Sequence, residues 1–136
     1  MKFGVLALDY DGTIARDGVL DPDVRAAIEE VRKRDIISVL VTGRILTDLR
    51  RLMGDLRLFD CVVAENGAVV AFPNAGRSTA HGHSPTQAFL EELSRRGITF
   101  ARGECVVEAD AELACQTLSV IREMELPLVV LLTEAG

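Results

Sequence analysis

Two carboxylates and a threonine follow one apolar run near the start of the chain. Residues 3–8 predict a buried strand, and Asp9 and Asp11 follow it at an i, i+2 spacing, ahead of Gly12 and Thr13. Two neighbouring carboxylates repel each other, so a protein keeps such a pair where a divalent cation or an acid–base reaction offsets the charge. The spacing therefore indicates cation binding, proton transfer or both. The alternative is an ordinary strand-end turn, because Asp and Gly favour turns.

The elements that would position these carboxylates form a βαβ unit. Asp21 and Pro22 are a strong helix start, and apolar residues at helical spacing carry this helix to about Arg34. Residues 36–41 then form a second apolar strand, which suits the interior of a parallel sheet. A right-handed crossover places the two strands side by side. Their carboxyl ends therefore meet at one sheet edge, where open α/β sheets bind ligands.

Two further strand ends add polar residues to this edge. Thr42, Gly43 and Arg44 follow the second strand, and a third strand over residues 60–64 leads to Asn66. A helix that begins beside Thr42 would favour an anion there, and Thr42 could equally be its N-cap. The chain has neither GxxxxGK[ST] nor GxGxxG, which disfavours a nucleotide P-loop or a dinucleotide fold. The edge suits a small phosphorylated ligand with a divalent cation, where one carboxylate attacks phosphorus and the other moves the proton.

Composition places the chain among layered α/β proteins. Its 136 residues are 49% hydrophobic with few aromatics, which is enough apolar material for a core. The net charge of -6 argues against a nucleic-acid partner, and the basic run 32–34 suits a helix end. Cys61, Cys105 and Cys115 are expected to be reduced core residues. With no signal peptide and no apolar run of membrane-spanning length, we expect a cytoplasmic protein.

The second half of the chain predicts a smaller α+β region. Residues 78–85 are expected to be an exposed linker, although His81 and His83 could in principle bind a metal. Helical spacing predicts one helix over residues 85–96 and another after Asp110. Short apolar runs predict strands over residues 105–108 and 127–132.

The string Asp9-Tyr10-Asp11-Gly12-Thr13 resembles motif I of the haloacid dehalogenase-like hydrolase superfamily. The segments 41–44 and 65–68 are similar to its Cof-type branch, which has a C2 cap. The resemblance implies an α/β fold with a three-layer Rossmann-like core and a parallel sheet over residues 1–82. It implies a partial α+β C2-type cap over residues 83–136.

The same resemblance implies a role for each matching residue. Asp9 would be the nucleophile and a metal ligand. Asp11 would be the general acid and base, with its main-chain carbonyl on Mg²⁺. Thr42 would bind the phosphate through its hydroxyl. The remaining residues expected around the phosphate are Gly12, Thr13, Gly43, Arg44 and Asn66.

The chain departs from the family pattern in its later motifs. The family has a lysine and then a GDxxxD-like acidic loop, whereas the two lysines here are Lys2 and Lys33, at a strand start and a helix end. We therefore consider a fragment, a chain completed by another chain, or a short relative without catalysis. The expected function is Mg²⁺-dependent hydrolysis of a small phosphorylated metabolite through an aspartyl-phosphate. A phosphomutase, which uses the same aspartyl-phosphate chemistry, is a less favoured possibility. The alternative is a catalytically silent binding or oligomerisation module, and unpaired sheet edges predict a homo-oligomer.

Overall fold

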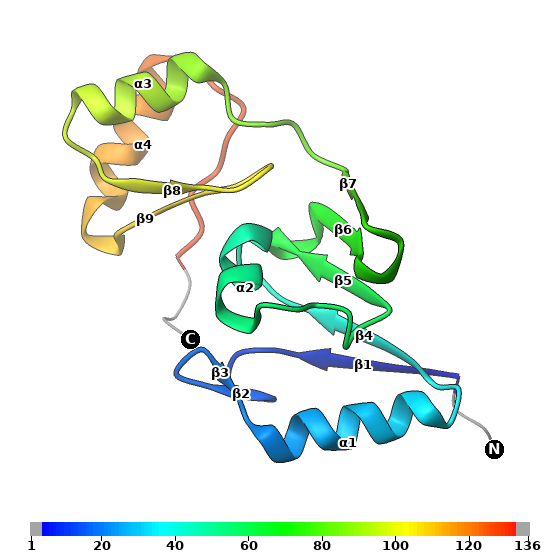
Figure 1. Cartoon of the computed structure of the whole chain (residues 1–136). Coiled ribbons are helices and arrows are strands. Elements are labelled where there is room, and N and C mark those ends of the chain that lie inside the picture. The colour runs from blue at the N-terminus through cyan, green and yellow to red at the C-terminus, as the bar shows by residue number, and fades with distance from the viewer. Residues whose placement is uncertain (1–3, 133–136) are drawn as a thin grey trace. The chain divides into compact units, whose positions relative to one another are not determined.

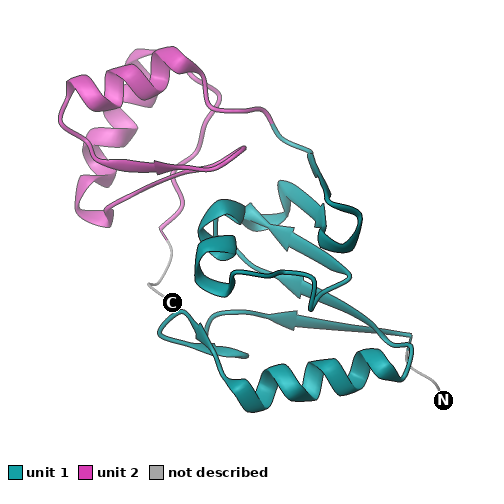
Figure 2. Ribbon diagram, in the orientation of Figure 1, with its two compact units in different colours: residues 1–82, 136 teal, residues 83–135 magenta. Residues whose placement is uncertain are grey.

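The computed structural model describes residues 4–132 of the chain (Figure 1). The chain divides into two compact units, of which unit 1 ends at Gly82 and unit 2 begins at His83 (Figure 2). Within the described range, no helix combines the length and the apolar character needed to cross a membrane.

Unit 1 is a mixed sheet with two helices. In chain order its elements are β1 (Val5–Asp9), β2 (Ala15–Arg16), β3 (Val19–Leu20), α1 (Pro22–Lys33), β4 (Ile37–Val41), α2 (Leu46–Met53), β5 (Cys61–Ala64), the 3-10 turn η1 (Glu65–Gly67), β6 (Val69–Phe72), the 3-10 turn η2 (Pro73–Ala75) and β7 (Arg77–Ala80). The sheet order is β1-β4-β5-β6-β7, while β2 and β3 form a separate hairpin. The first three strands are parallel and the last two antiparallel, which confirms the predicted α/β, Rossmann-like fold.

The sequence signals at both ends of α1 act as predicted. The Asp21 side chain accepts a hydrogen bond of 2.7 Å from the Asp23 amide, and Pro22 occupies the first turn. Arg32 and Lys33 lie in the last turn, where cations favour the helix dipole. The basic run is therefore the end of a helix.

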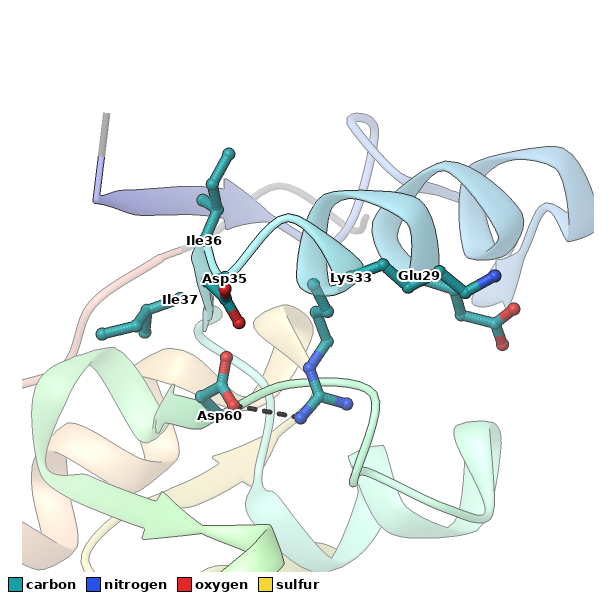
Figure 3. Close-up of a pocket in the computed structure, with 7 residues that line it drawn as sticks. Glu29, Lys33, Asp35, Ile36, Ile37 and Asp60 are labelled. Atoms are coloured by element: carbon teal, nitrogen blue, oxygen red, sulfur yellow. Dashed lines mark hydrogen bonds and ion pairs between the residues drawn. The ribbon is translucent and has the colours of Figure 1, made fainter. Parts of the chain in front are cut away.

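The start of β4 is fixed by the carboxylate of Asp60. Its oxygens accept hydrogen bonds from the Ser38 amide at 2.8 Å and from Arg32 Nη2 at 3.0 Å. Arg32 and Asp60 line an open hollow of about 510 Å³ together with Ile36 and Ile37. Figure 3 shows their ion pair. Because β4 begins here, the hollow lies at the opposite end of the strand from the candidate site residues.

Replacing Asp60 with asparagine is expected to lower the free energy of unfolding by about 1 kcal/mol at neutral pH, after discounting for partial exposure. Partial burial raises the pKa of Asp60, but the Ser38 amide and Arg32 outweigh it and hold the pKa below its ordinary value of 3.8. A lowered folded-state pKa contributes stability above the unfolded value, and this contribution is lost as the pH falls through the folded value.

Urea unfolding at neutral pH and at about pH 2.5 measures this effect. The difference between wild type and Asp60→Asn should shrink at the acidic pH. Asp55→Asn is the matched control, because Asp55 pairs with Arg57 in an exposed position and should contribute little. An Asp60→Asn deficit that is unchanged in acid would contradict the assigned role.

Unit 2 packs two helices against a short hairpin. Its elements are α3 (Gln87–Arg95), β8 (Phe100–Arg102), β9 (Val107–Ala109), the 3-10 turn η3 (Ala111–Leu113) and α4 (Ala114–Glu123). Thr86 caps α3 by accepting a hydrogen bond from the Phe89 amide at 3.3 Å. Both predicted helices are present, and the predicted strand over 105–108 begins two residues later, as β9. The buried core consists of Phe89, Leu90, Leu93, Ile98, Val120 and Ile121.

Two sequence predictions are wrong, over residues 127–132 and at Cys115, and the linker expected over residues 78–85 is right only in part. The predicted strand over 127–132 is absent, and Val129 in this segment is 80% exposed. An apolar run becomes a strand only beside another strand, and no described strand pairs with this one. The first residues of the linker expected over 78–85 belong to β7. This segment has no alternation of apolar residues, but its pairing with β6 makes it a strand. Cys115 is exposed rather than part of the core.

Candidate functional site

The loop after β1 turns sharply around the carbonyl of Tyr10. That oxygen accepts hydrogen bonds from the amides of Thr13 at 3.3 Å and of Ile14 and Ala15 at 3.0 Å. Gly12 has a φ of 76°, a left-handed conformation that favours glycine. Asp9 is exposed at the end of β1, and its Oδ1 accepts a hydrogen bond of 2.9 Å from the Tyr10 amide. The turn thus presents the Asp9 carboxylate at the carboxyl end of the strand.

Tyr10, between the two aspartates, ties this loop to the hairpin of β2 and β3. Its ring is fully buried, and its hydroxyl donates a hydrogen bond of 2.8 Å to the Gly18 carbonyl at the hairpin turn. Burial raises the pKa of Tyr10, and the nearby Arg44 opposes part of this rise. The hairpin is therefore anchored on the residue that separates Asp9 from Asp11.

Thr42 follows β4 and is almost fully buried. Its amide donates to the Val63 carbonyl at 2.8 Å, and its hydroxyl oxygen accepts a hydrogen bond of 3.0 Å from the Arg44 amide. Among residues 4–132 no described contact takes up the hydroxyl proton, so the hydroxyl can donate it to a ligand. The N-cap of α2 is Ile45, so the reading of Thr42 as N-cap of this helix is wrong.

Asn66 lies in a turn with a left-handed backbone beside the Thr42 loop. Glu65 and Asn66 have φ values of 52° and 57°, a conformation that asparagine tolerates well but that glutamate rarely adopts outside functional or tightly constrained positions. The Asn66 amide donates to the Thr42 carbonyl at 3.4 Å, and the Glu65 amide donates to the Arg44 carbonyl at 3.0 Å. A Cβ at Gly43 would lie only 2.8 Å from Asn66 Oδ1, so the glycine makes room for this side chain.

Arg44 joins the first loop to the second. Its Nε and Nη2 donate to the two carboxylate oxygens of Asp11 at 2.7 and 2.8 Å, and its Nη1 reaches Asp48 on α2 at 3.2 Å. The guanidinium carbon also lies 5.9 Å from the centre of the Tyr10 ring. The hydrogen bond to Asp11 is the main cause that raises the pKa of Arg44 above its ordinary value, so this side chain stays charged.

The structure thus brings the predicted residues into one neighbourhood in unit 1. Asp9, Val41 and Val63 stand in register on adjacent parallel strands, so the loops that follow them begin side by side. Asp11 meets Arg44, and Asn66 meets Thr42 and Gly43, as the contacts above describe. Sequence reasoning placed Arg44 near the phosphate but missed its two carboxylate partners and the anchoring role of Tyr10. No signal in the local sequence identifies those partners.

A hollow of about 440 Å³ adjoins the first loop. Gly12 and Thr13 line it together with the hairpin residues Arg16 and Val19 and the start of α1. Among the described residues, no group of three or more His, Cys, Asp and Glu side chains could hold a metal ion. Any cation at this edge would therefore depend on fewer side chains of this chain, with main-chain and ligand oxygens beside them.

Comparisons with known proteins give one consistent result. The model of the family described as haloacid dehalogenase-like hydrolase matches residues 6–101. A crystal structure of Thermoplasma acidophilum 0175 is similar over 91% of this chain, with a TM-score of 0.64 and 21% identity. BT1666 from Bacteroides thetaiotaomicron, described among phosphatases of this superfamily, is similar over 92% of the chain, with a TM-score of 0.55 and 26% identity. A haloacid dehalogenase-like hydrolase from B. subtilis is similar over 89%, with a TM-score of 0.56 and 20% identity.

These similarities extend over only part of each solved structure. The chain covers 59% of the Thermoplasma protein, 47% of BT1666 and 46% of the B. subtilis hydrolase. It therefore spans about half the length of the solved structures that it matches. Among curated proteins, no sequence matches the chain.

Proposed function

This chain belongs to the haloacid dehalogenase-like hydrolase family, and from that membership we propose that it carries the nucleophile half of a phosphohydrolase site. The substrate class that suits it is a small phosphorylated metabolite. The observation that supports the proposal most strongly is the meeting of three strand-end loops. They carry the exposed Asp9 carboxylate, the Thr42 hydroxyl and Asn66.

In the proposed reaction Asp9 is the nucleophile. A carboxylate oxygen of Asp9 forms a bond to phosphorus while the ester P–O bond breaks, which gives an aspartyl-phosphate and an alkoxide. Asp11 donates a proton to this leaving oxygen and later takes a proton from the water that hydrolyses the intermediate. The Thr42 hydroxyl, whose oxygen is already fixed by the Arg44 amide, donates its proton to a phosphoryl oxygen.

The donor atoms of the first loop suit Mg²⁺. Among the described contacts the Asp9 carboxylate accepts only the Tyr10 amide, so it retains oxygen lone pairs for a cation. Mg²⁺ takes oxygen ligands, keeps several waters and is commonly held by one or two carboxylates plus substrate phosphate, so a three-side-chain cluster is not needed. Asp9, through its carboxylate, and Asp11, through its main-chain carbonyl, would hold it. The ion would supply charge neutralisation between the Asp9 carboxylate and the phosphate.

Hydrolysis of p-nitrophenyl phosphate by the purified chain tests the proposal. We expect turnover that requires Mg²⁺, disappears with a chelator and returns when Mg²⁺ is restored in excess, because the two anions repel each other without it. The control is the same assay without protein. Turnover that persists undiminished in chelator would contradict the Mg²⁺ requirement.

A specific contact favours the second candidate, a catalytically silent module. Both carboxylate oxygens of Asp11 accept hydrogen bonds from Arg44, so in this arrangement they are engaged by a guanidinium instead of facing a leaving-group oxygen. Binding of Mg²⁺ and inorganic phosphate without turnover of any phosphate ester would distinguish this candidate from the hydrolase. If the chain binds both ligands without turnover, hydrolysis would require catalytic groups from outside these 136 residues.

A further inference from the structure

The peptide of Tyr10 separates the two aspartates of the candidate site and organises the loop that carries them. Its amide donates a hydrogen bond of 2.9 Å to Asp9 Oδ1. Its carbonyl oxygen accepts three amides, those of residues 13–15, at 3.0 to 3.3 Å. A shift or rotation of this one peptide would therefore move the Asp9 carboxylate together with the turn that follows it.

The side chain of Tyr10 fixes the same peptide from its other end. The ring is fully buried, and the hydroxyl donates a hydrogen bond of 2.8 Å to the carbonyl of Gly18 in the turn between β2 and β3. The carbonyl of Tyr10 also accepts the amide of Ala15, where β2 begins. Tyr10 therefore binds the hairpin at its start through the backbone and at its turn through the side chain.

The hairpin turn is itself held against other parts of unit 1. Its strands pair through only two residues each, which is too few for a hairpin to be stable alone. Gly18 has a φ of 79°, and a Cβ built on it would lie 3.6 Å from both Arg44 Nη2 and Leu52 Cδ2. The turn thus lies beside the guanidinium that binds Asp11 and beside α2. A tether to this turn connects the first loop to the second loop and to a helix.

We propose that the Tyr10 hydroxyl positions the Asp9 nucleophile by tethering its loop to the hairpin turn. This role rests on the proposed function, because it concerns the residue that would attack phosphorus. Asp9 is exposed, so packing does not hold its side chain, and among the described contacts its carboxylate accepts the Tyr10 amide alone. Misplacing reacting atoms by about 1 Å can lower a rate about 100-fold, so the direction of this carboxylate affects the reaction strongly.

The Tyr10 hydroxyl acts through the loop and not on the substrate. It is buried, and the Gly18 carbonyl accepts its proton. Burial also raises the pKa of Tyr10 above its ordinary value, so the hydroxyl stays protonated at neutral pH and keeps this hydrogen bond. Tyr10 is therefore a positioning residue, and its loss should change how well the bound ester reacts more than how tightly it binds.

Tyr10→Phe removes the hydroxyl and keeps the buried ring. With p-nitrophenyl phosphate in saturating Mg²⁺, we expect kcat to fall about tenfold, because the Asp9 carboxylate is no longer held in one direction. KM should change by less than about twofold, because the proposed phosphate-binding residues are unaltered. A kcat equal to that of wild type, with or without a change in KM, would overturn the proposal.

Ser38→Ala is the matched control, because it also removes one buried hydroxyl that donates to a carbonyl. Ser38 Oγ donates to the Leu58 carbonyl at 3.1 Å, at the opposite end of β4 from the candidate site. Both variants should lower the midpoint of urea unfolding, whereas only Tyr10→Phe should lower kcat. Equal losses of kcat in the two variants would show that lower stability causes the loss, and would overturn the positioning role.

Amide hydrogen exchange measured by NMR tests the same role without turnover. The amide of residue 10 should exchange about tenfold faster in Tyr10→Phe than in wild type, because the tether limits the opening of its contact with Asp9. The Thr42 amide, which donates to the Val63 carbonyl, should keep its rate. If wild type releases no p-nitrophenol, the proposed function fails, and these exchange rates alone decide the positioning role. Equal rates for residue 10 in the two proteins would overturn it.

Discussion

Replacement of Asp9 by asparagine is expected to lower the rate of phosphate-ester hydrolysis by at least about 1,000-fold, because the amide is a poor nucleophile and removal of a covalent nucleophile removes most of the catalytic effect. The fold should be intact, since Asp9 is exposed and its Oδ1 can still accept the Tyr10 amide after the change. The rate of p-nitrophenol release in saturating Mg²⁺, compared with wild type at equal concentration, measures the effect.

Asp17→Asn is the matched control for this substitution. Asp17 lies in the same segment, in the hairpin turn, with a φ of 51° that asparagine tolerates well. Its activity should equal that of wild type. Inorganic phosphate should still bind Asp9→Asn, because the change removes a negative charge beside the anion. Activity that survives Asp9→Asn undiminished would exclude Asp9 as the nucleophile.

The loops of the site could be located from the sequence because each follows a recognisable strand. An uninterrupted apolar run ends at Asp9, another at Thr42 and a third before Asn66, and the helix start at Asp21 fixes the βαβ connection between the first two. A right-handed parallel connection then leaves one place for the strand ends to meet. Local pattern and general topology together determine this part of the molecule.

The partners of Arg44 could not be located in the same way. Asp11 is 33 residues away in the sequence, and an arginine next to a predicted phosphate site has an anion and several carboxylates to choose from. Which one it binds depends on the distance between two loops, which only the packed sheet sets. In the folded chain Arg44 binds the carboxylates of Asp11 and Asp48.

The errors over residues 127–132 and at β7 share a cause in strand pairing. Residues 127–132 have strong strand propensity, whereas β7 (Arg77–Ala80) has little, yet only β7 is a strand. A strand depends on a neighbouring edge as well as on its own residues. The free edge of β6 provides one for β7, through the register from Val69 to Phe72. Whether a segment forms a strand here therefore depends less on its own strand propensity than on a free strand edge beside it.

Arg44→Ala is expected to lower the free energy of unfolding of unit 1 by about 2–3 kcal/mol. The side chains of Arg44 and Asp11 are only 25% and 22% exposed, so this pair is less screened than a surface ion pair. Removing the guanidinium leaves the carboxylates of Asp11 and Asp48 without the cation that they share. It also removes the cation–π contact between Arg44 and the Tyr10 ring. Arg44→Lys should recover only part of the loss, because an ammonium cannot form the two-pronged contact with Asp11.

Arg51→Ala is the control for this prediction, because Arg51 pairs with the same Asp48 but is 79% exposed. Its effect should stay below about 0.5 kcal/mol. The chain has one tyrosine and no tryptophan, so urea unfolding followed by tyrosine fluorescence reports on the buried Tyr10 of unit 1. The pKa of Tyr10 should also rise in Arg44→Ala, because Arg44 lowers it in wild type. If Arg44→Ala and Arg51→Ala were equally stable, the contact between Arg44 and Asp11 would not hold the two loops together.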